Sequence, residues 1–335
     1  MRNKNIENTN KIIQKVKSIF HPEYYRGWGK TKKYFEGWYY KVVNAEENKI
    51  FAFIPGISMD ENGTKQAFIQ VLEGKNLNSK YNKFDVQEFL PKIGKFEIQI
   101  ASNFFSSEKI ILALPTIKGE LNFKHHVDWP SSWYSPGIMG PFAFVPFMEC
   151  YHGILSMDHI IQGQLVINDE TVDFTNGRGY MEKDWGHSFP SAYIWIQTNH
   201  FSNSGISLIV SVAKIPWLGC SFVGFIAGLW FNNEFFEFTT YNFSKLSKSI
   251  VDNKEVKLVL ENRKYRLEII AHRKTATELA SPISGFMDGR ISESMTAEID
   301  VKLYDKKNKK IFFQDTGRNA GLEVTGKIQE ITICS

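Results

Sequence analysis

The chain has 335 residues, of which 43% are hydrophobic, and its formal net charge at pH 7 is only +4. This length and composition predict about two domains with well-packed cores. The small net charge, without a long Lys/Arg run or zinc-finger spacing, argues against a protein that binds nucleic acid. The three cysteines are odd in number and far apart, which is typical of a reducing compartment rather than of a disulfide framework.

Residues 1–33 lead into the rest of the chain. Between Ile12 and Phe20, apolar residues recur at helical spacing with lysines among them, which predicts a short amphipathic helix. We expect this helix to pack on the body of the protein, and contact with a membrane surface is the alternative. No apolar core of a signal peptide is present, so we expect a cytoplasmic protein, either free or peripheral at a membrane.

Strand signals dominate from residue 34 onward. The uncharged segment 215–231 is followed by Asn232-Asn233 and an aromatic run, which predicts a hairpin rather than a membrane span. Helices and strands do not alternate, so we expect an all-β fold. Further strands are expected at 38–43, 50–54, 66–72, 96–100, 109–114, 163–167, 192–198, 206–213, 255–260, 265–272, 297–304 and 327–333.

A repeated pair of strands indicates two domains. An aromatic strand that begins near Tyr34 returns as an apolar strand, and the same succession begins again near Phe189. We therefore expect two tandem antiparallel β-barrels, over residues 34–185 and 186–335. The aromatic content of 14% suits strands and also suits the lining of an apolar ligand cavity.

Residues 128–153, assigned to the first barrel, differ from the rest of the chain in composition. Pro and Gly preclude regular structure over much of this segment, and aromatic side chains make it apolar. Loops usually lie on the surface, so an apolar loop of this length must cover something or be covered. We expect it either to line a ligand cavity or to plug the junction of the two barrels.

The segment 179–190 groups carboxylates, an amine and an imidazole around a Trp. If it begins as a strand, Glu182 and Asp184 share one face. In an apolar cavity these carboxyls can form an acid–base pair, because desolvation keeps at least one protonated near neutral pH. The alternative is a structural clamp in which Arg178 or Lys183 neutralises both carboxylates.

Other titratable residues give weaker signals. His187 and Glu36 are further acid–base candidates, and a polar cluster at 149–159 follows the apolar loop. No HExxH, Gly-rich phosphate loop or GxGxxG is present, so we expect neither a metal nor another cofactor.

Three separated motifs resemble those of the tocopherol cyclase family. They are Phe35-Glu36-Gly37-Trp38-Tyr39, Lys183-Asp184-Trp185-Gly186 and Ala320-Gly321-Leu322-Glu323. The resemblance implies two lipocalin-like barrels and a cofactor-independent isomerase that closes a ring on a prenylated hydroquinol. Such a reaction needs a desolvated acid to protonate an alkene, a folded substrate chain and the exclusion of water.

On this resemblance we expect Asp184 to be the general acid, tuned by Glu182 or Glu36, with His187 as a further candidate. Aromatic faces stabilise positive charge; the substrate-binding candidates are Trp38, Tyr40, Trp133, Phe144, Trp185 and Trp195. A composition rich in Lys, Asn and Ile is typical of a bacterial protein, so the substrate need not be a tocopherol precursor. The alternative function is a lipocalin-like carrier or sensor of an apolar ligand, without chemistry.

Overall fold

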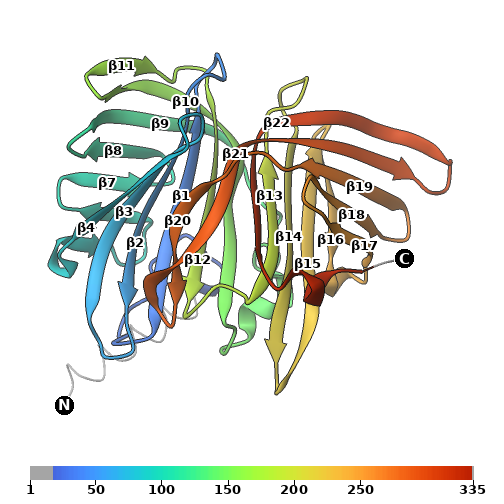
Figure 1. The fold of residues 1–335 in the computed structure, drawn as a ribbon, viewed down its shortest axis with the longest axis horizontal. Coiled ribbons are helices and arrows are strands. Elements are labelled where there is room, and N and C mark those ends of the chain that lie inside the picture. Colours follow the sequence, from blue (N-terminus) through green and yellow to red (C-terminus); the bar gives the residue numbers. More distant parts are fainter. Residues whose placement is uncertain (1–17, 334–335) are drawn as a thin grey trace.

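Two curled antiparallel sheets stand side by side in the computed structural model, which describes residues 18–333 (Figure 1). Each sheet is wound around its own apolar core, and a third apolar cluster lies between the sheets. The predicted amphipathic helix falls almost wholly on residues 1–17, outside the described part. Within that described part, no helix is long and apolar enough to cross a membrane.

The first sheet has twelve strands in the order β4-β3-β2-β1-β12-β10-β9-β8-β7-β6-β5, with β11 paired to β10. Its strands are β1 (Tyr34–Val43), β2 (Ile50–Met59), β3 (Lys65–Glu73), β4 (Asn78–Phe84), β5 (Phe89–Pro91), β6 (Glu97–Ile100), β7 (Asn103–Ser106), β8 (Lys109–Ala113), β9 (Ile117–Val127), β10 (Cys150–Ile167), β11 (Glu170–Asp173) and β12 (Arg178–Gly186). Short 3-10 helices, η1 (Val86–Glu88) and η2 (Gly140–Phe144), lie in its connections.

The second sheet has ten strands in the order β16-β15-β14-β13-β22-β21-β19-β18-β17, with β20 paired to β21. Its strands are β13 (Ala192–Thr198), β14 (Ser207–Trp217), β15 (Cys220–Phe231), β16 (Glu234–Thr239), β17 (Lys245–Val251), β18 (Glu255–Glu261), β19 (Tyr265–His272), β20 (Thr277–Ile283), β21 (Phe286–Asp305) and β22 (Lys310–Gly326). The 3-10 helices η3 (Thr240–Asn242) and η4 (Ile328–Ile331) complete it.

The sequence prediction of an all-β protein with tandem antiparallel barrels is confirmed. The hairpin predicted across Asn232 and Asn233 is also found, as β15 and β16. Both asparagines have positive φ, the left-handed conformation that a two-residue hairpin turn of this hand requires and that Asn tolerates.

The predicted strand at 327–333 is wrong. Strand β22 ends at Gly326, whose φ of +81° turns the chain, and the 3-10 helix η4 follows. Ile331 is buried in the second core, so the apolar residues of this segment cap the barrel instead of continuing the sheet. The long polar strand β22 itself was not predicted, because it carries few of the β-branched residues on which strand prediction depends.

The two sheets are joined by more than the chain connection. The hairpin of β20 and β21 reaches from the second sheet onto the first, as Figure 1 shows. There the Ser79 hydroxyl donates a hydrogen bond of 2.6 Å to the backbone oxygen of Glu278, and the amide of Ala280 donates one of 2.8 Å to the Gln70 side chain. The junction is therefore a packed interface that can enclose a cavity.

Candidate functional site

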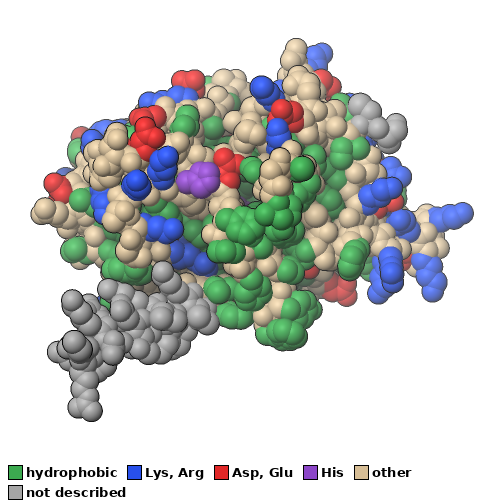
Figure 2. All heavy atoms as spheres, turned by 90° about the horizontal axis from the view of Figure 1, so that it is seen from below, with side chains coloured by type: hydrophobic (Ala, Val, Ile, Leu, Met, Phe, Trp, Pro, Cys, Tyr) green, Lys and Arg blue, Asp and Glu red, His purple; other side chains and the backbone are tan. Residues whose placement is uncertain are grey.

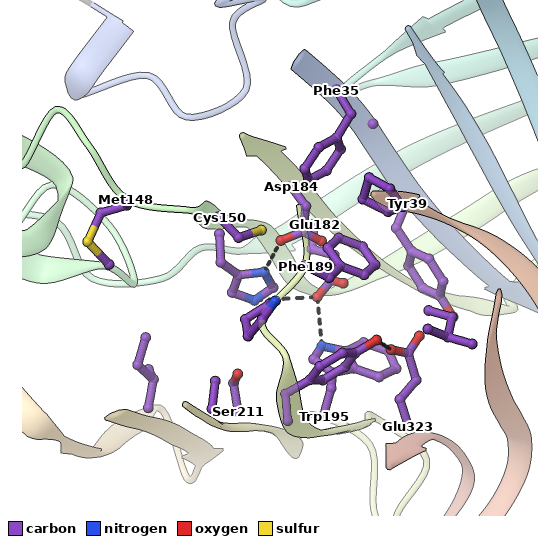
Figure 3. A pocket seen from close by; sticks show the side chains of 18 of the residues that line it. Phe35, Tyr39, Met148, Cys150, Glu182, Asp184, Phe189, Trp195, Ser211 and Glu323 are labelled. Atoms are coloured by element: carbon purple, nitrogen blue, oxygen red, sulfur yellow. Dashed lines mark hydrogen bonds and ion pairs between the residues drawn. The ribbon is translucent and has the colours of Figure 1, made fainter. Parts of the chain in front are cut away.

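An apolar cavity of about 180 Å³ lies where the two sheets meet (Figure 3). Strands β1, β2 and β3 of the first sheet and β13, β14 and β15 of the second contribute to its wall. Its apolar lining includes Phe35, Ile54, Phe68, Phe189, Ile215, Phe222, Phe225, Leu279 and Ile291. Cavities of this kind, apolar with a few convergent polar groups, are the usual form of a small-molecule site.

The apolar loop before β10 has both of the roles that its sequence suggested. Met139, Phe142 and Met148 line the cavity, and Trp129 and Ile138 pack into the cluster between the sheets. The loop therefore closes one side of the cavity and also fills part of the junction.

Three titratable side chains meet at the cavity wall. Glu182 and Asp184 lie two residues apart on the same face of β12. His152 lies on the neighbouring strand β10, where it is paired directly with Asp184. His152 Nδ1 is 2.8 Å from Asp184 Oδ1, and His152 Nε2 is 3.6 Å from Glu182 Oε2. The imidazole thus stands between the two carboxyl groups and connects them.

Glu182 is the most enclosed of the three, with 5% of its surface exposed. Its Oε2 accepts a hydrogen bond from the Tyr180 hydroxyl and another, of 3.1 Å, from Trp195 Nε1, which Figure 3 shows. Burial raises the pKa of Glu182 to about 7, and this effect, reinforced by Asp184, outweighs the lowering by His152 and by the two hydrogen bonds. The carboxyl therefore exchanges its proton close to neutral pH.

His152 has the opposite balance. Burial alone would lower its pKa, but the neighbouring charges of Asp184 and Glu182 and the hydrogen bond to Asp184 raise it to about 9. At neutral pH the ring is therefore an imidazolium, and both nitrogens carry protons. A proton can move between the carboxyl groups through this ring, because one nitrogen faces each of them.

A second pair of buried carboxyls lies on the second sheet. Glu323 lines the cavity and accepts a hydrogen bond of 2.6 Å from the Tyr193 hydroxyl (Figure 3). Glu293 is paired with it on the adjacent strand and accepts one of 2.5 Å from Tyr39. Burial raises the pKa of Glu293 to about 7 and that of Glu323 well above its usual range.

Sequence reasoning did not single out His152, Glu323 or Glu293 as site residues. His152 stood in a recognised segment, the polar cluster at 149–159, and Glu323 ends the third motif, whereas Glu293 lies in neither segment. What was missing was the pairing of β10 with β12 and of β22 with β13, because strand pairing between distant segments cannot be deduced from spacing.

Glu36, an acid candidate in the sequence, lies outside the cavity lining. Its Oε1 is 2.5 Å from Lys183 Nζ, and both side chains are fully buried. The Tyr34 hydroxyl and the backbone amides of Arg26 and Gly27 also donate hydrogen bonds to this carboxylate, at 2.6–3.1 Å. The pair joins the lead-in segment to strands β1 and β12, which is a structural role.

The cations proposed as a clamp on Glu182 and Asp184 are engaged elsewhere. Lys183 contacts Glu36 on the opposite face of β12, and Arg178 forms a two-contact ion pair with Asp158. Since these cations have other partners, the acid–base interpretation of the two carboxyls gains over the structural one.

The remaining predicted residues divide into four groups, of which three follow here. Trp195 lines the cavity, as expected of a substrate-binding residue. Trp38, Tyr40 and Trp185 are buried in the core of the first sheet, away from the cavity lining. His187 follows the end of β12 and is exposed.

Phe144 and Trp133, also expected to bind substrate, lie on the protein surface. Trp133 has 81% of its surface exposed. Neither side chain lines the cavity, although both belong to the loop that covers it. Sequence alone could not separate the inward-facing residues of this loop from the outward-facing ones, because an irregular segment has no periodicity.

His152, Glu182 and Asp184 are also the residues that could hold a metal ion, since one ligand atom from each lies within 4.8 Å of the others. The His152–Asp184 contact occupies one ring nitrogen, and Glu182 Oε2 already accepts two hydrogen bonds. The expectation of a reaction without metal or cofactor stays a prediction.

Fold and site together define a two-barrel β-protein with a titratable triad in an apolar cavity between the barrels. The chain belongs to the tocopherol cyclase-like family, whose model matches residues 115–326. It is 22% identical over 361 residues to the probable chloroplastic tocopherol cyclase of Oryza sativa subsp. japonica, covering 89% of this chain and 76% of the relative. Over 198 residues it is 27% identical to the chloroplastic tocopherol cyclase of Zea mays, covering 56% of this chain and 41% of that protein.

Two solved structures share the fold. The crystal structure of CghA with Sch210972 superposes with a TM-score of 0.55 at 10% identity, covering 88% of this chain and 89% of that one. An AttH-like protein from Nitrosomonas europaea gives a TM-score of 0.51 at 12% identity, with coverages of 87% and 92%. At these identities the likeness extends to the fold, and family membership supports an enzyme of the tocopherol cyclase-like type.

Proposed function

We propose that the protein is a cofactor-independent cyclase that closes a ring on a prenylated phenol, hydroquinol or similar apolar alkene by acid protonation. The observation that carries the proposal is the Glu182 carboxyl. It is buried in an apolar cavity, has a pKa of about 7 and is connected through His152 to a second carboxyl group. The names of the relatives, both tocopherol cyclases, support the same reaction class.

In the first step Glu182 donates its proton to the less substituted carbon of the alkene, and the π electrons form the new C–H bond. Positive charge develops on the more substituted carbon. A general acid works best when its pKa lies near the working pH, and that of Glu182 does so. The aromatic lining, including Trp195, stabilises the cation and keeps out water that would trap it.

In the second step the phenol oxygen bonds to the cationic carbon, and its proton passes to Asp184. The substrate and product are isomers, because one proton is added and one is lost. His152 then resets the site: its Nδ1 receives the proton from Asp184 as its Nε2 returns one to Glu182. The assignment differs from the sequence expectation, in which Asp184 was the acid, because Glu182 is the carboxyl whose pKa burial raises to about 7.

Incubation with prenylated hydroquinols under anaerobic conditions tests this function. Chromatography with mass detection should show a product of unchanged mass, shifted retention and resistance to oxidation to the quinone. The Glu182→Gln variant should still bind substrate, but it should not form the product. If substrate is bound and recovered unchanged across the panel, the protein is a carrier or sensor of apolar ligands, the alternative function.

A further inference from the structure

Exposed apolar side chains gather on the lower face of the molecule, which Figure 2 shows from below. We call five of them the aromatic rim: Trp133, Tyr134, Phe144, Phe147 and Leu218. The first four belong to the loop before β10, and Leu218, 78% exposed, is at the tip of the β14–β15 hairpin. Monomeric proteins rarely expose such a group of large apolar residues without an interaction that covers it.

The rim is continuous with the cavity. The ring of Phe147 lies 5.7 Å from that of Trp217, which in turn lies 5.8 Å from Phe142. Phe142 and its stacked neighbour Phe222 line the cavity. An unbroken path of aromatic contacts therefore leads from the exposed rim to the cavity wall, which places the rim beside the cavity.

The composition of the rim points to a lipid surface. Trp and Tyr have an apolar body and a polar tip, which suits the boundary between lipid headgroups and acyl chains. Figure 2 also shows Lys and Arg side chains on the same face, as a surface that meets anionic headgroups would have.

The sequence that precedes the described chain is basic. The described chain begins at Ser18, and two residues later the Phe20 ring contacts that of rim residue Phe144 at 6.1 Å. The described chain therefore begins next to the rim, after residues 1–17 of the sequence. They carry one acidic residue, Glu7, against the basic residues Arg2, Lys4, Lys11, Lys15 and Lys17.

We propose that the aromatic rim docks the protein on an anionic lipid bilayer, with the cavity entrance facing the lipid. The apolar substrate then passes between bilayer and cavity without crossing water. The passage of substrate rests on the proposed cyclase function, whereas the docking itself rests only on the surface. Trp133 and Phe144 do not line the cavity and so do not contact substrate there. Docking on lipid gives these two exposed side chains a role.

Vesicle flotation of the full chain tests the docking without any substrate. The wild type should float with vesicles of phosphatidylcholine and phosphatidylglycerol and much less with phosphatidylcholine alone. The combined variant Trp133→Ser, Phe147→Ser and Leu218→Ser should bind the anionic vesicles at least about tenfold more weakly than the wild type. Ile311→Ser is the matched control, because Ile311 is a half-exposed apolar residue on β22, far from the rim.

The proposal is overturned if the wild type does not float, or if the combined variant floats as well as the wild type. Equal flotation with both kinds of vesicle would overturn the role of anionic lipid. A lipid-free dimer that the combined variant loses, without flotation, would show that the rim binds a second copy instead. None of these outcomes depends on turnover, so the cyclase function would stand or fall separately.

Discussion

Glu182 and Asp184 lie two residues apart on one strand, yet their surroundings give them different chemistry. Glu182 faces Tyr180 and Trp195 in the enclosed part of the cavity, whereas Asp184 is 23% exposed and pairs with the imidazolium. Desolvation favours the neutral form of a carboxyl, and it raises the pKa of Glu182 to about 7. This environment is the ground on which we propose Glu182 as the acid, by the same logic as in enzymes that use two carboxyl groups.

Replacing the acid tests this assignment. Glu182→Gln keeps the shape of the side chain but has no proton to donate, so we expect kcat to fall by about 10²–10⁴-fold with little change in substrate affinity. Glu323→Gln makes the same exchange at another buried carboxyl of the cavity, one that His152 does not contact. This control variant should keep a kcat at least about tenfold higher than that of Glu182→Gln. The reverse ranking in steady-state kinetics would make Glu323 the acid.

The pH dependence of kcat follows from the same groups. Glu182 must be protonated to act, so kcat should be highest below its pKa and fall as the pH rises through about 7. His152→Gln removes a positive charge that lowers the pKa of Glu182. The alkaline fall should therefore move to higher pH in this variant, together with a lower maximum. An unmoved pH profile in the variant would contradict the coupling of the two groups.

The side chains of strand β12 alternate between a face that packs into the protein and a face that lines the cavity. Met181 and Trp185 face the core of the first sheet and Lys183 faces Glu36, whereas Glu182 and Asp184 face the cavity. This division could be predicted from the sequence, because side chains of a strand alternate between its faces. The identity of their partners could not, since it depends on which distant strands pair with β12.

Glu36 and Lys183 provide a test of the structural face. Glu36→Gln leaves a buried ammonium without its counter-charge, so we expect a loss of about 3–5 kcal/mol in the free energy of unfolding. The double variant Glu36→Gln and Lys183→Met should recover part of that loss. Turnover at low temperature should stay close to that of the wild type. Denaturant unfolding measures the first effect, and a catalytic loss without destabilisation would return Glu36 to the list of acids.

Gly37 allows the cavity to be narrowed without disturbing β1. A Cβ at this position would have Ile54 Cγ2 as its nearest neighbour, at 3.7 Å, which is ordinary contact. Gly37→Leu should therefore fold and project into the cavity beside Asp184, with which Gly37 is paired. We expect KM to rise more for long prenyl chains than for short ones. An equal effect on both would show that the chain binds elsewhere.

At the scale of the whole molecule, the site exists only because the two sheets dock. Trp195 of the second sheet donates to Glu182 of the first, and Tyr39 of the first donates to Glu293 of the second. The all-β class was predictable from strand and turn patterns, and the two barrels from the repeated pair of strands together with the family resemblance. The cavity was not, because it is formed by surfaces that meet only through tertiary packing.

The buried carboxyl Glu293 should make this docking depend on pH. Its pKa is raised to about 7 in the folded protein, so the folded state binds an extra proton, and this stabilisation is lost as the pH rises from about 4.5 to about 7. Gln cannot ionise, so the Glu293→Gln variant does not lose this stabilisation. Its Tm should therefore rise by a few degrees relative to that of the wild type as the pH increases over that interval. A constant difference in Tm from pH 5 to pH 8 would contradict the raised pKa.

Turnover in deuterium oxide tests the central claim most directly, because it asks whether the protein delivers a proton to carbon. A prenylated hydroquinol is incubated anaerobically with the wild type, with Glu182→Gln and without protein, and the product is analysed by mass spectrometry after exchange back into water. Acid-catalysed cyclisation predicts a ring-closed product with one deuteron fixed on carbon, formed by the wild type and almost absent with Glu182→Gln. Recovery of unlabelled, open-chain substrate from the wild type, or equal labelling with Glu182→Gln, would contradict the account.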